Sequence, residues 1–260
     1  MKPTFLRKLA LSVTLLVTGL LVVPAWGSPE SDADQKLITE LRQRTSALQK
    51  KILATSDPAE QARLQKQIPL LVEEILPKLS PKARVPMQVA LKLVQPIQQA
   101  GADYMQKIAD FSSSPDSDFT TLKAREEIKP RLAMIAELNE MNEGLINQLE
   151  NFETSADKML DESSLNPLEK REFKAGLTQG FGRRIGPMKA IRTLDTRMFE
   201  IFTAALQHLD LHWGKWKVTP GKPITWDAEA ADAEFQAMMK ELGVLAERQG
   251  AAQAVLSQRL

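Results

Sequence analysis

Residues 231–256 read ADAEFQAMMKELGVLAERQGAAQAVL, and this stretch decides the fold class. Eight positions in it follow one another at alternating steps of four and three residues: Ala231, Phe235, Met238, Leu242, Leu245, Gln249, Ala252 and Leu256. This spacing places the eight side chains on one face of an α-helix. Because that face is mostly apolar, it is expected to pack against a neighbouring helix, as in bundles and coiled coils.

The same period recurs in most of the chain beyond residue 30. It is found in an early stretch (Ile38, Leu41, Thr45, Leu48, Ile52) and in a central one (Ile191, Leu194, Met198, Ile201, Ala205, His208, His212). The pattern predicts an all-α protein, a bundle of about six long helices. Their expected ranges are 31–54, 58–79, 86–110, 118–160, 167–212 and 228–258.

Capping signals and prolines refine these ranges. Residues 166–169 (Asn-Pro-Leu-Glu) combine an N-cap, a proline at the first helical position and a glutamate that reaches back to the cap. Four prolines fall inside the predicted helices: Pro69, Pro96, Pro130 and Pro187. Because an interior proline removes a helical hydrogen bond, we expect kinked helices, with the strongest break at Pro187, which follows Gly186.

Residues 213–226 (WGKWKVTPGKPITW) depart from the helical period and predict a short β-hairpin at about 215–226, before the last helix. A three-residue loop at 220–222 would place Trp216 opposite Trp226 on the same face as Val218 and Ile224. That face can pack on the helices or be presented to a partner. Trp213, Trp216 and Trp226 are therefore candidate partner-binding residues.

The N-terminus has the three parts of a secretory signal peptide. Basic residues precede fifteen uncharged residues at 9–23, and Pro24 and a small-x-small site at 25–27 follow. We expect cleavage near Gly27–Ser28, which leaves 28–260 as a single helical-bundle domain in the periplasm. The alternative is an uncleaved inner-membrane anchor, for which fifteen residues are short.

The amino-acid composition argues against several kinds of partner and of chemical site. The chain has 260 residues, 34 basic and 33 acidic, with a formal net charge of +1, so nothing attracts it globally to nucleic acid. Only 5% of the residues are aromatic, which disfavours a stacking platform for bases. There is no cysteine, and this excludes disulfides, thiolate metal sites and a lipid-modified N-terminal cysteine.

The charges form two opposite blocks. Residues 137–162 contain eight acidic residues and one lysine, whereas residues 169–197 contain eight basic and three acidic residues. These segments are expected to pair as antiparallel helices. In the alternative interpretation, basic residues including Arg183 and Arg184 form a patch that binds an acidic partner.

The search for catalytic motifs finds little. His208 and His212 share a helix face and could hold zinc, but no glutamate directly follows the first histidine and no third ligand is near in sequence. There is no Gly-x-Ser-x-Gly elbow and no Glu-x-x-His pair. We therefore expect a protein that is not an enzyme and uses no cofactor or metal. The alternatives are a lipid or hydrophobe carrier and a metal-dependent hydrolase that uses the two histidines.

The order of these features resembles the YiaF-like family of uncharacterised gammaproteobacterial envelope proteins. The similar stretches are residues 65–69 (QKQIP), residues 165–167 (LNP), and the long helix that leads into the tryptophan hairpin and a final helix. The resemblance implies a helical periplasmic protein of unknown activity and supplies no catalytic residues. Members of the family carry a lipoprotein cysteine after the signal, which this chain lacks. We expect a binding or scaffolding role with an envelope protein partner, and membrane contact only through the N-terminal segment if it stays uncleaved.

Overall fold

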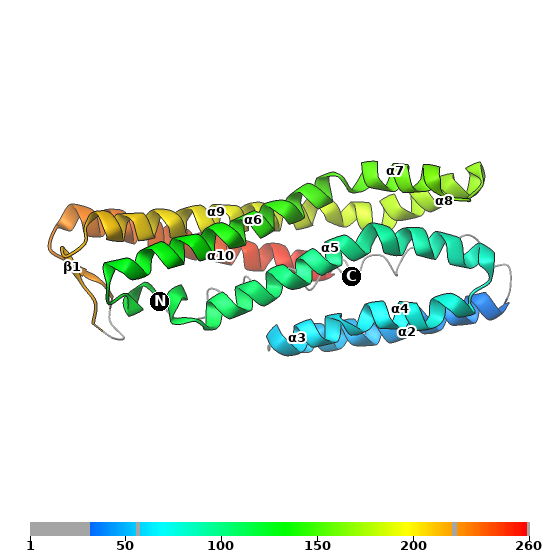
Figure 1. Ribbon diagram of the computed structural model, residues 1–260, viewed down its shortest axis with the longest axis horizontal. Helices are drawn as coiled ribbons and strands as arrows, with labels where there is room; N and C mark the ends of the chain where they lie inside the picture. Colours follow the sequence, from blue (N-terminus) through cyan, green and yellow to red (C-terminus); the bar gives the residue numbers. More distant parts are fainter. Residues whose placement is uncertain (1–31, 56–57, 220–222, 259–260) are drawn as a thin grey trace.

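The structure is a computed structural model that describes residues 32–55, 58–219 and 223–258. The all-α prediction is confirmed, and so is the hairpin before the last helix (Figure 1). The predicted signal peptide, its cleavage site and the hairpin loop at 220–222 lie outside the described residues.

The α-helices are α2 (Asp32–Ala54), α3 (Pro58–Gln65), α4 (Gln67–Ile75), α5 (Pro81–Ser113), α6 (Ile128–Glu150), α7 (Phe152–Glu162), α8 (Pro167–Leu177), α9 (Arg183–Leu211) and α10 (Glu229–Gln258). The 3-10 turns are η1 (Leu76–Lys78), η2 (Pro115–Ser117), η3 (Phe119–Thr121) and η4 (Arg125–Glu127). A π-helical segment, η5 (Thr178–Gly182), joins α8 to α9. Strands β1 (Trp216–Lys217) and β2 (Thr225–Trp226) form the hairpin.

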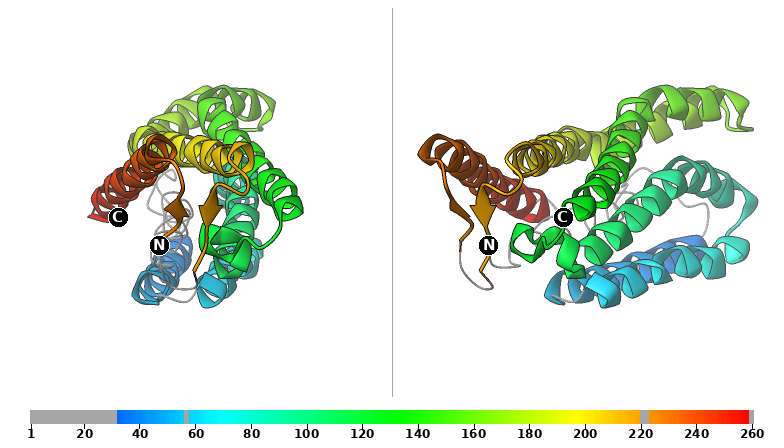
Figure 2. Two further views of the ribbon diagram at one scale, coloured as in Figure 1. Left: turned by 90° about the vertical axis from the view of Figure 1, so that its left-hand side faces the viewer. Right: turned by 60° about the vertical axis from the view of Figure 1, so that its left-hand side comes forward.

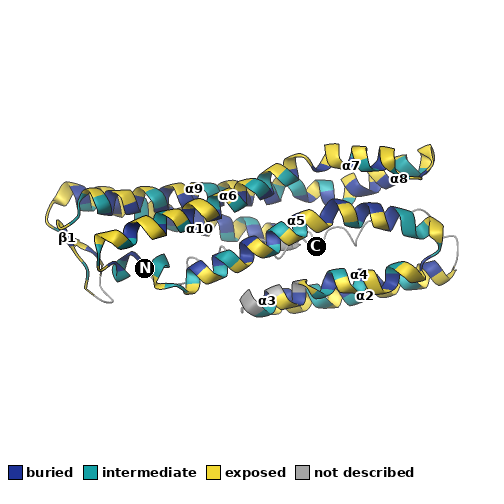
Figure 3. Ribbon diagram, in the orientation of Figure 1, coloured by how far each residue is buried: buried dark blue, intermediate teal, exposed yellow. Residues whose placement is uncertain are grey.

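Helix α9 is the centre of the bundle. It packs against α6 on one side and α10 on the other, and the end-on view of Figure 2 shows it between them. Helix α5 packs on α6, and the layer of α2, α3 and α4 lies against α5 (Figure 1). Buried residues form stripes along these helices (Figure 3). The hairpin closes one end of the bundle, and α7 and α8 lie at the other.

The start of α5 is earlier than the predicted residue 86. Ser80 is its N-cap, with Oγ accepting from the Ala83 N–H at 3.4 Å, and Pro81 takes the first helical position. The Ser80 N–H and Oγ–H in turn donate to the buried carboxylate of Asp34, at 2.9 and 2.7 Å. Because Asp34 belongs to α2, these bonds tie the start of α2 to the start of α5.

The predicted helix at 118–160 is wrong at its beginning, because residues 115–127 form 3-10 turns and α6 begins at Ile128. Ser114 Oγ accepts from the Asp116 N–H at 3.1 Å, and Asp118 Oδ1 accepts from the Thr120 N–H at 2.8 Å. Such local bonds satisfy the backbone in place of a helical ladder. The predicted helix is also interrupted at Asn151, between α6 and α7.

Arg131 of α6 holds these turns together. Its guanidinium donates to the carbonyls of Asp116 at 3.2 Å and Asp118 at 2.8 Å, and to Thr121 Oγ1 at 2.9 Å. The side chain is 3% exposed, and burial lowers the pKa of Arg131 from its ordinary value although Asp116 and Glu127 oppose the shift. One buried cation therefore organises a segment that lies ten to fifteen residues before it.

Pro96 lies inside α5 as predicted, but the other three prolines act differently from the sequence prediction. The predicted helix at 58–79 is divided at Lys66, which places Pro69 in the first turn of α4, and Pro130 lies in the first turn of α6. A proline in a first turn removes no helical hydrogen bond. The predicted break at Pro187 is also wrong, because α9 continues through this residue.

The irregularity near Pro187 is the π segment η5. Pro187 offers no N–H to the carbonyl of Arg183, four residues earlier. The π turn, which adds a residue to the helical repeat, lies immediately before Arg183. The helix is therefore distorted about one turn before Pro187, in the π segment. Helix α9 is α-helical from Arg183 to Leu211.

The hairpin register agrees with the prediction. Trp216 pairs with Trp226 and Lys217 with Thr225. Trp216 and Ile224 are buried in the core, and Val218 and Trp226 pack against it. Of the two interpretations, the structure supports a face that packs on the helices.

The opposite charge blocks meet as predicted. Lys189 of α9 pairs with Glu150 of α6 at 2.7 Å, and Lys174 of α8 pairs with Asp157 of α7 at 2.5 Å. These pairs are exposed, so each contributes little to the free energy of unfolding. They nevertheless match the antiparallel arrangement of the two segments.

The structure predicts that Arg131→Met lowers the free energy of unfolding by about 2–4 kcal/mol, because several part-buried acceptors lose a buried charged donor. Urea denaturation measures this loss. The exposed Lys129, two residues earlier on α6, provides the control, and Lys129→Met should change stability by less than about 0.5 kcal/mol. Equal effects of the two substitutions would contradict the role given to Arg131.

Candidate functional site

Aromatic rings gather where the hairpin meets α9 and α10. The Trp226 ring lies 5.1 Å from His208 of α9 and 5.4 Å from Phe235 of α10, centroid to centroid. Trp216 lies 6.4 Å from Trp226. These contacts hold the hairpin against both helices. They depend on the strand register in which Trp216 pairs with Trp226, as the sequence predicted.

The three candidate tryptophans differ in exposure. Trp216 is 8% exposed and its Nε1–H donates to the Leu209 carbonyl at 2.9 Å, so it is a core residue. Trp213 is half-buried, with its ring 5.0 Å from that of Trp216. Trp226 is half-buried, and its buried Nε1 has no acceptor within the described part of the chain. Only Trp213 and Trp226 retain surface that a partner could contact.

The two histidines belong to the same cluster, with their ring centroids 4.7 Å apart. His208 Nε2–H donates to the Ala231 carbonyl at 2.9 Å, and His208 Nδ1 lies 3.6 Å from a carboxylate oxygen of Glu234. Among residues 32–55, 58–219 and 223–258, no group of three or more histidines and carboxylates is placed to hold a metal ion. His208 connects α9 to α10 in this structure, and the His212 ring packs on His208 and Trp226.

The predicted basic patch (Arg183, Arg184, Lys189, Arg192 and Arg197) does not form one surface. Arg183 is exposed, whereas Arg184 is buried, and burial lowers the pKa of Arg184. Arg197 bridges Glu200 and Glu241, each at 2.9 Å. Lys189 is paired with α6, as described above, and Arg192 is buried. Lys189 and Arg197 are also at the surface but are engaged with acidic side chains, and Arg183 is the exposed member for which the described residues supply no ion pair.

A buried polar network lies between α5, α9 and α10. Asp195 of α9 is 0% exposed and accepts hydrogen bonds from the Tyr104 hydroxyl of α5 at 3.1 Å and from the Gln249 amide of α10. Arg192, one turn earlier on α9, pairs with Asp195 at 2.9 Å and lies over the Tyr104 ring at 4.9 Å. The network thus joins three helices through one carboxylate.

Helix α6 joins the network through Asn142. Its Nδ2 donates to the Arg192 carbonyl at 2.8 Å and to Thr196 Oγ1 at 2.9 Å. Sequence reasoning missed this cluster. One available signal was Gln249, a polar residue on the otherwise apolar face of the last helix.

Burial raises the pKa of Asp195 to about 6, while Arg192, Tyr104 and Gln249 act in the opposite direction. Burial also raises the pKa of Tyr104 well above its ordinary value, and the nearby Asp195 carboxylate adds to that shift. Because Asp195 and Tyr104 are fully buried, neither is placed to meet a substrate from solvent. The network aligns α5, α9 and α10.

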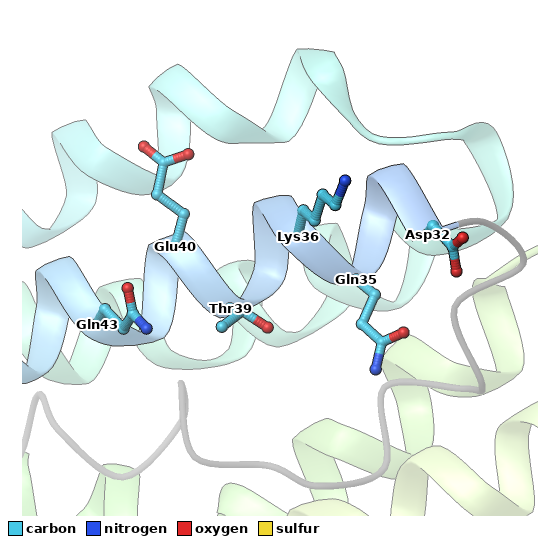
Figure 4. Close-up of a pocket in the computed structure, with 6 residues that line it drawn as sticks. All are labelled: Asp32, Gln35, Lys36, Thr39, Glu40 and Gln43. Carbon is cyan, nitrogen blue, oxygen red and sulfur yellow. The ribbon is translucent and has the colours of Figure 1, made fainter.

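Two surface hollows are also formed by described residues. One, of about 390 Å³, is lined by exposed residues of α2 alone, including Lys36, Glu40 and Gln43. Figure 4 shows these side chains projecting from the helix in different directions. They do not converge on one point, so this hollow offers no constellation for catalysis.

The second hollow, of about 710 Å³, lies over the π segment. Glu153 of α7 lines it, together with Lys174 of α8, Thr178 and Gln179 of η5, and Arg183 at the start of α9. All five side chains are exposed. This hollow contains the one predicted partner-binding arginine that is at the surface.

Comparison of the chain with protein-family models, curated proteins and solved structures gives no match. The likeness to the YiaF-like family therefore stays a prediction. Among the helices in the described ranges, none is long and apolar enough to cross a membrane.

Trp216→Phe is expected to destabilise the protein by about 1–2 kcal/mol more than Trp226→Phe, as measured by urea denaturation. Both changes remove the same ring volume and an indole N–H, but only the Trp216 N–H has an acceptor. The difference between the variants reports that hydrogen bond together with the deeper burial of the Trp216 ring. Equal losses would contradict both contributions.

The raised pKa of Asp195 gives a pH dependence with a definite sign. Between pH about 4 and 6 the folded protein holds a proton that the unfolded chain has lost, so this contribution to stability is full below pH about 4 and falls as pH rises to about 6. The unfolding free energy of the wild type relative to Asp195→Asn should fall by about 3 kcal/mol over that range.

The exposed Asp103, beside Tyr104 on α5, supplies the control, because Asp103→Asn also removes one carboxylate. The wild type relative to Asp103→Asn should show no such fall. A rise in wild-type stability relative to Asp195→Asn over the same pH range would mean that Arg192 outweighs burial.

Proposed function

We propose that this chain is an exported, non-enzymatic helical protein that binds or scaffolds a protein partner in the bacterial cell envelope. The N-terminal sequence pattern and the resemblance to the YiaF-like family support the export and the compartment. The fold supports a binding role, because α9 and its neighbours form a bundle whose buried polar side chains bond to one another.

The observation that carries the proposal is that the buried polar side chains of the bundle contact one another. Asp195 accepts a hydrogen bond from Tyr104 of α5 and pairs with Arg192, one turn earlier on α9, and His208 bridges α9 to α10. Groups so engaged and buried hold the fold together. Recognition of another molecule then falls to the surface of the bundle.

The hollow over the π segment is the surface we assign to the partner. It contains the exposed guanidinium of Arg183 and the exposed side chains of Thr178 and Gln179. Segments of π-helix occur frequently at functional sites. An arginine with a polar surround is a common anchor in protein interfaces.

A site-specific photo-crosslinker tests this assignment. Placed at Gln179 and activated in intact envelopes, it should give one crosslinked protein in high yield. Adding Arg183→Glu to the same chain should lower that yield several-fold, because the anchor charge is reversed, without lowering the melting temperature.

A crosslinker at the exposed Lys129 of α6, outside the hollow, is the positional control and should not give this product. Excess purified wild-type protein should compete for the Gln179 product, whereas the Arg183→Glu protein should not. Equal products from both positions, or equal competition by both proteins, would refute the assignment of this surface.

A further inference from the structure

Helix α10 carries a second apolar stripe, on the face opposite its buried residues. Its members are exposed and follow one another at steps of four, seven, seven and four residues: Ala233, Ala237, Val244, Ala251 and Val255. With about 100° of turn per helical residue, all five lie within about 20° of Val244 around the helix axis. We refer to these five residues as the outer stripe.

The outer stripe lies at the edge of the bundle. Val244 and Val255 are 41% and 47% exposed, and they are two of the five large apolar residues that are exposed in the described chain. Helix α10 packs on α9 and on β2, and Figure 2 shows it on the outside of the bundle. A continuous apolar stripe on an exposed helix face is typical of a helix that packs against a further helix.

Charged side chains flank the outer stripe on both sides. Lys240 and Glu247 lie about 40–60° to one side of it, and Glu241 and Arg248 lie about 40–60° to the other. All four are exposed. Glu241 pairs with Arg197 of α9, whereas the described residues supply no ion pair for Lys240, Glu247 or Arg248. Each flank therefore presents one basic and one acidic side chain to a neighbour.

The outer stripe matches itself in a second copy of the chain whose α10 runs antiparallel. A two-fold axis at Val244 places each residue of one helix opposite the residue equally far from Val244 on the other side. Ala237 then faces Ala251 of the second copy, and Ala233 faces Val255. Every member of the stripe thus meets another member.

The same axis pairs the charges. In an antiparallel pair related by this axis, each flank of one helix faces the same flank of the other in reverse order. Lys240, four residues before Val244, then lies beside Glu247 of the second copy, three residues after it. Glu241 lies beside Arg248 in the same way, although its bond to Arg197 weakens that contact. Each pair forms twice, because the arrangement is symmetric.

We propose that the outer face of α10 is the interface of a homodimer, in which α10 packs antiparallel on its own copy with Val244 at the two-fold axis. The inference does not depend on the proposed function, whose hollow is lined by residues of α7, α8, η5 and α9. A parallel pair would also bring opposite charges together. It would set alanine against alanine and valine against valine, however, and so pack less evenly than an arrangement in which Val255 faces Ala233.

Sedimentation equilibrium of the purified protein tests the dimer. The wild type should associate reversibly, and Val244→Asp should raise the dissociation constant at least about ten-fold, because two carboxylates then meet at the axis. Leu70→Asp is the matched control, since Leu70 of α4 is also exposed and apolar. It should leave the constant unchanged.

Two results of this experiment would overturn the proposal. One is a wild type that stays monomeric up to about 1 mM. The other is a dimer that Val244→Asp weakens no more than Leu70→Asp does. The far-ultraviolet circular dichroism of the dilute variants should equal that of the wild type, because both positions are exposed.

An exchange of charges tests the antiparallel register. Lys240→Glu should weaken the dimer about ten-fold, because it turns two attractive contacts into repulsive ones. Adding Glu247→Lys should restore the affinity, since the exchanged charges face each other again. In a parallel pair the double exchange would instead oppose like charges, so a double variant weaker than Lys240→Glu would overturn the register.

Introduced thiols test which residues face each other, because the chain has no cysteine of its own. Ala237→Cys and Ala251→Cys proteins should form a disulfide-linked dimer when they are mixed and oxidised. Neither should do so alone, because the identical positions of an antiparallel pair lie about 21 Å apart. A linked dimer from each variant alone, with none gained on mixing, would overturn the antiparallel arrangement.

Discussion

A carboxylate buried between three helices imposes the strictest constraint on this bundle. Asp195 is fully enclosed, and its partners come from α5, α9 and α10. Packing of apolar side chains is non-directional, so apolar stripes alone tolerate a helix that slides or turns. A buried carboxylate that loses a donor costs several kcal/mol, and this penalty holds the three helices at one relative position.

The constraint explains why α9 is central. Helix α9 makes the most extensive contacts of the bundle, with α6 and with α10. Arg192 contributes to both contacts of α9. Its side chain pairs with Asp195, which accepts from α10, and its carbonyl accepts a hydrogen bond from Asn142 of α6. The hairpin then closes the end of α9 through the Trp216 bond to Leu209, and His208 connects the same end to α10.

Local periodicity predicted much of this fold. The helical class, the Asn166 cap and the pairing of Trp216 with Trp226 follow from residues close in sequence, so the sequence contains their causes. The turns at 115–127 could not be predicted in the same way, because Arg131, which lies beyond them, stabilises them. Asp195 was missed because two of its partners, Gln249 and Tyr104, lie 54 and 91 residues away.

The candidate site was less predictable than the fold. Adjacent arginines are equivalent in a sequence, yet Arg183 is exposed and Arg184 is buried, because successive helical residues point about 100° apart. Likewise, the hairpin pattern fixes which tryptophans share a face but not which of them is covered by helices. These distinctions depend on tertiary packing, which periodicity does not encode.

The four-residue set of Tyr104, Arg192, Asp195 and Gln249 has a consequence for how this protein can diverge over time. A replacement at one of these positions strands a desolvated group at the others, so single changes are selected against until a compensating one arises. Descendant chains should therefore keep the quartet whole or exchange it together for an apolar one. The exposed residues of α2 make ion pairs such as Glu40–Arg44 in contact with solvent, where the loss of one partner costs little, and they are expected to drift one at a time.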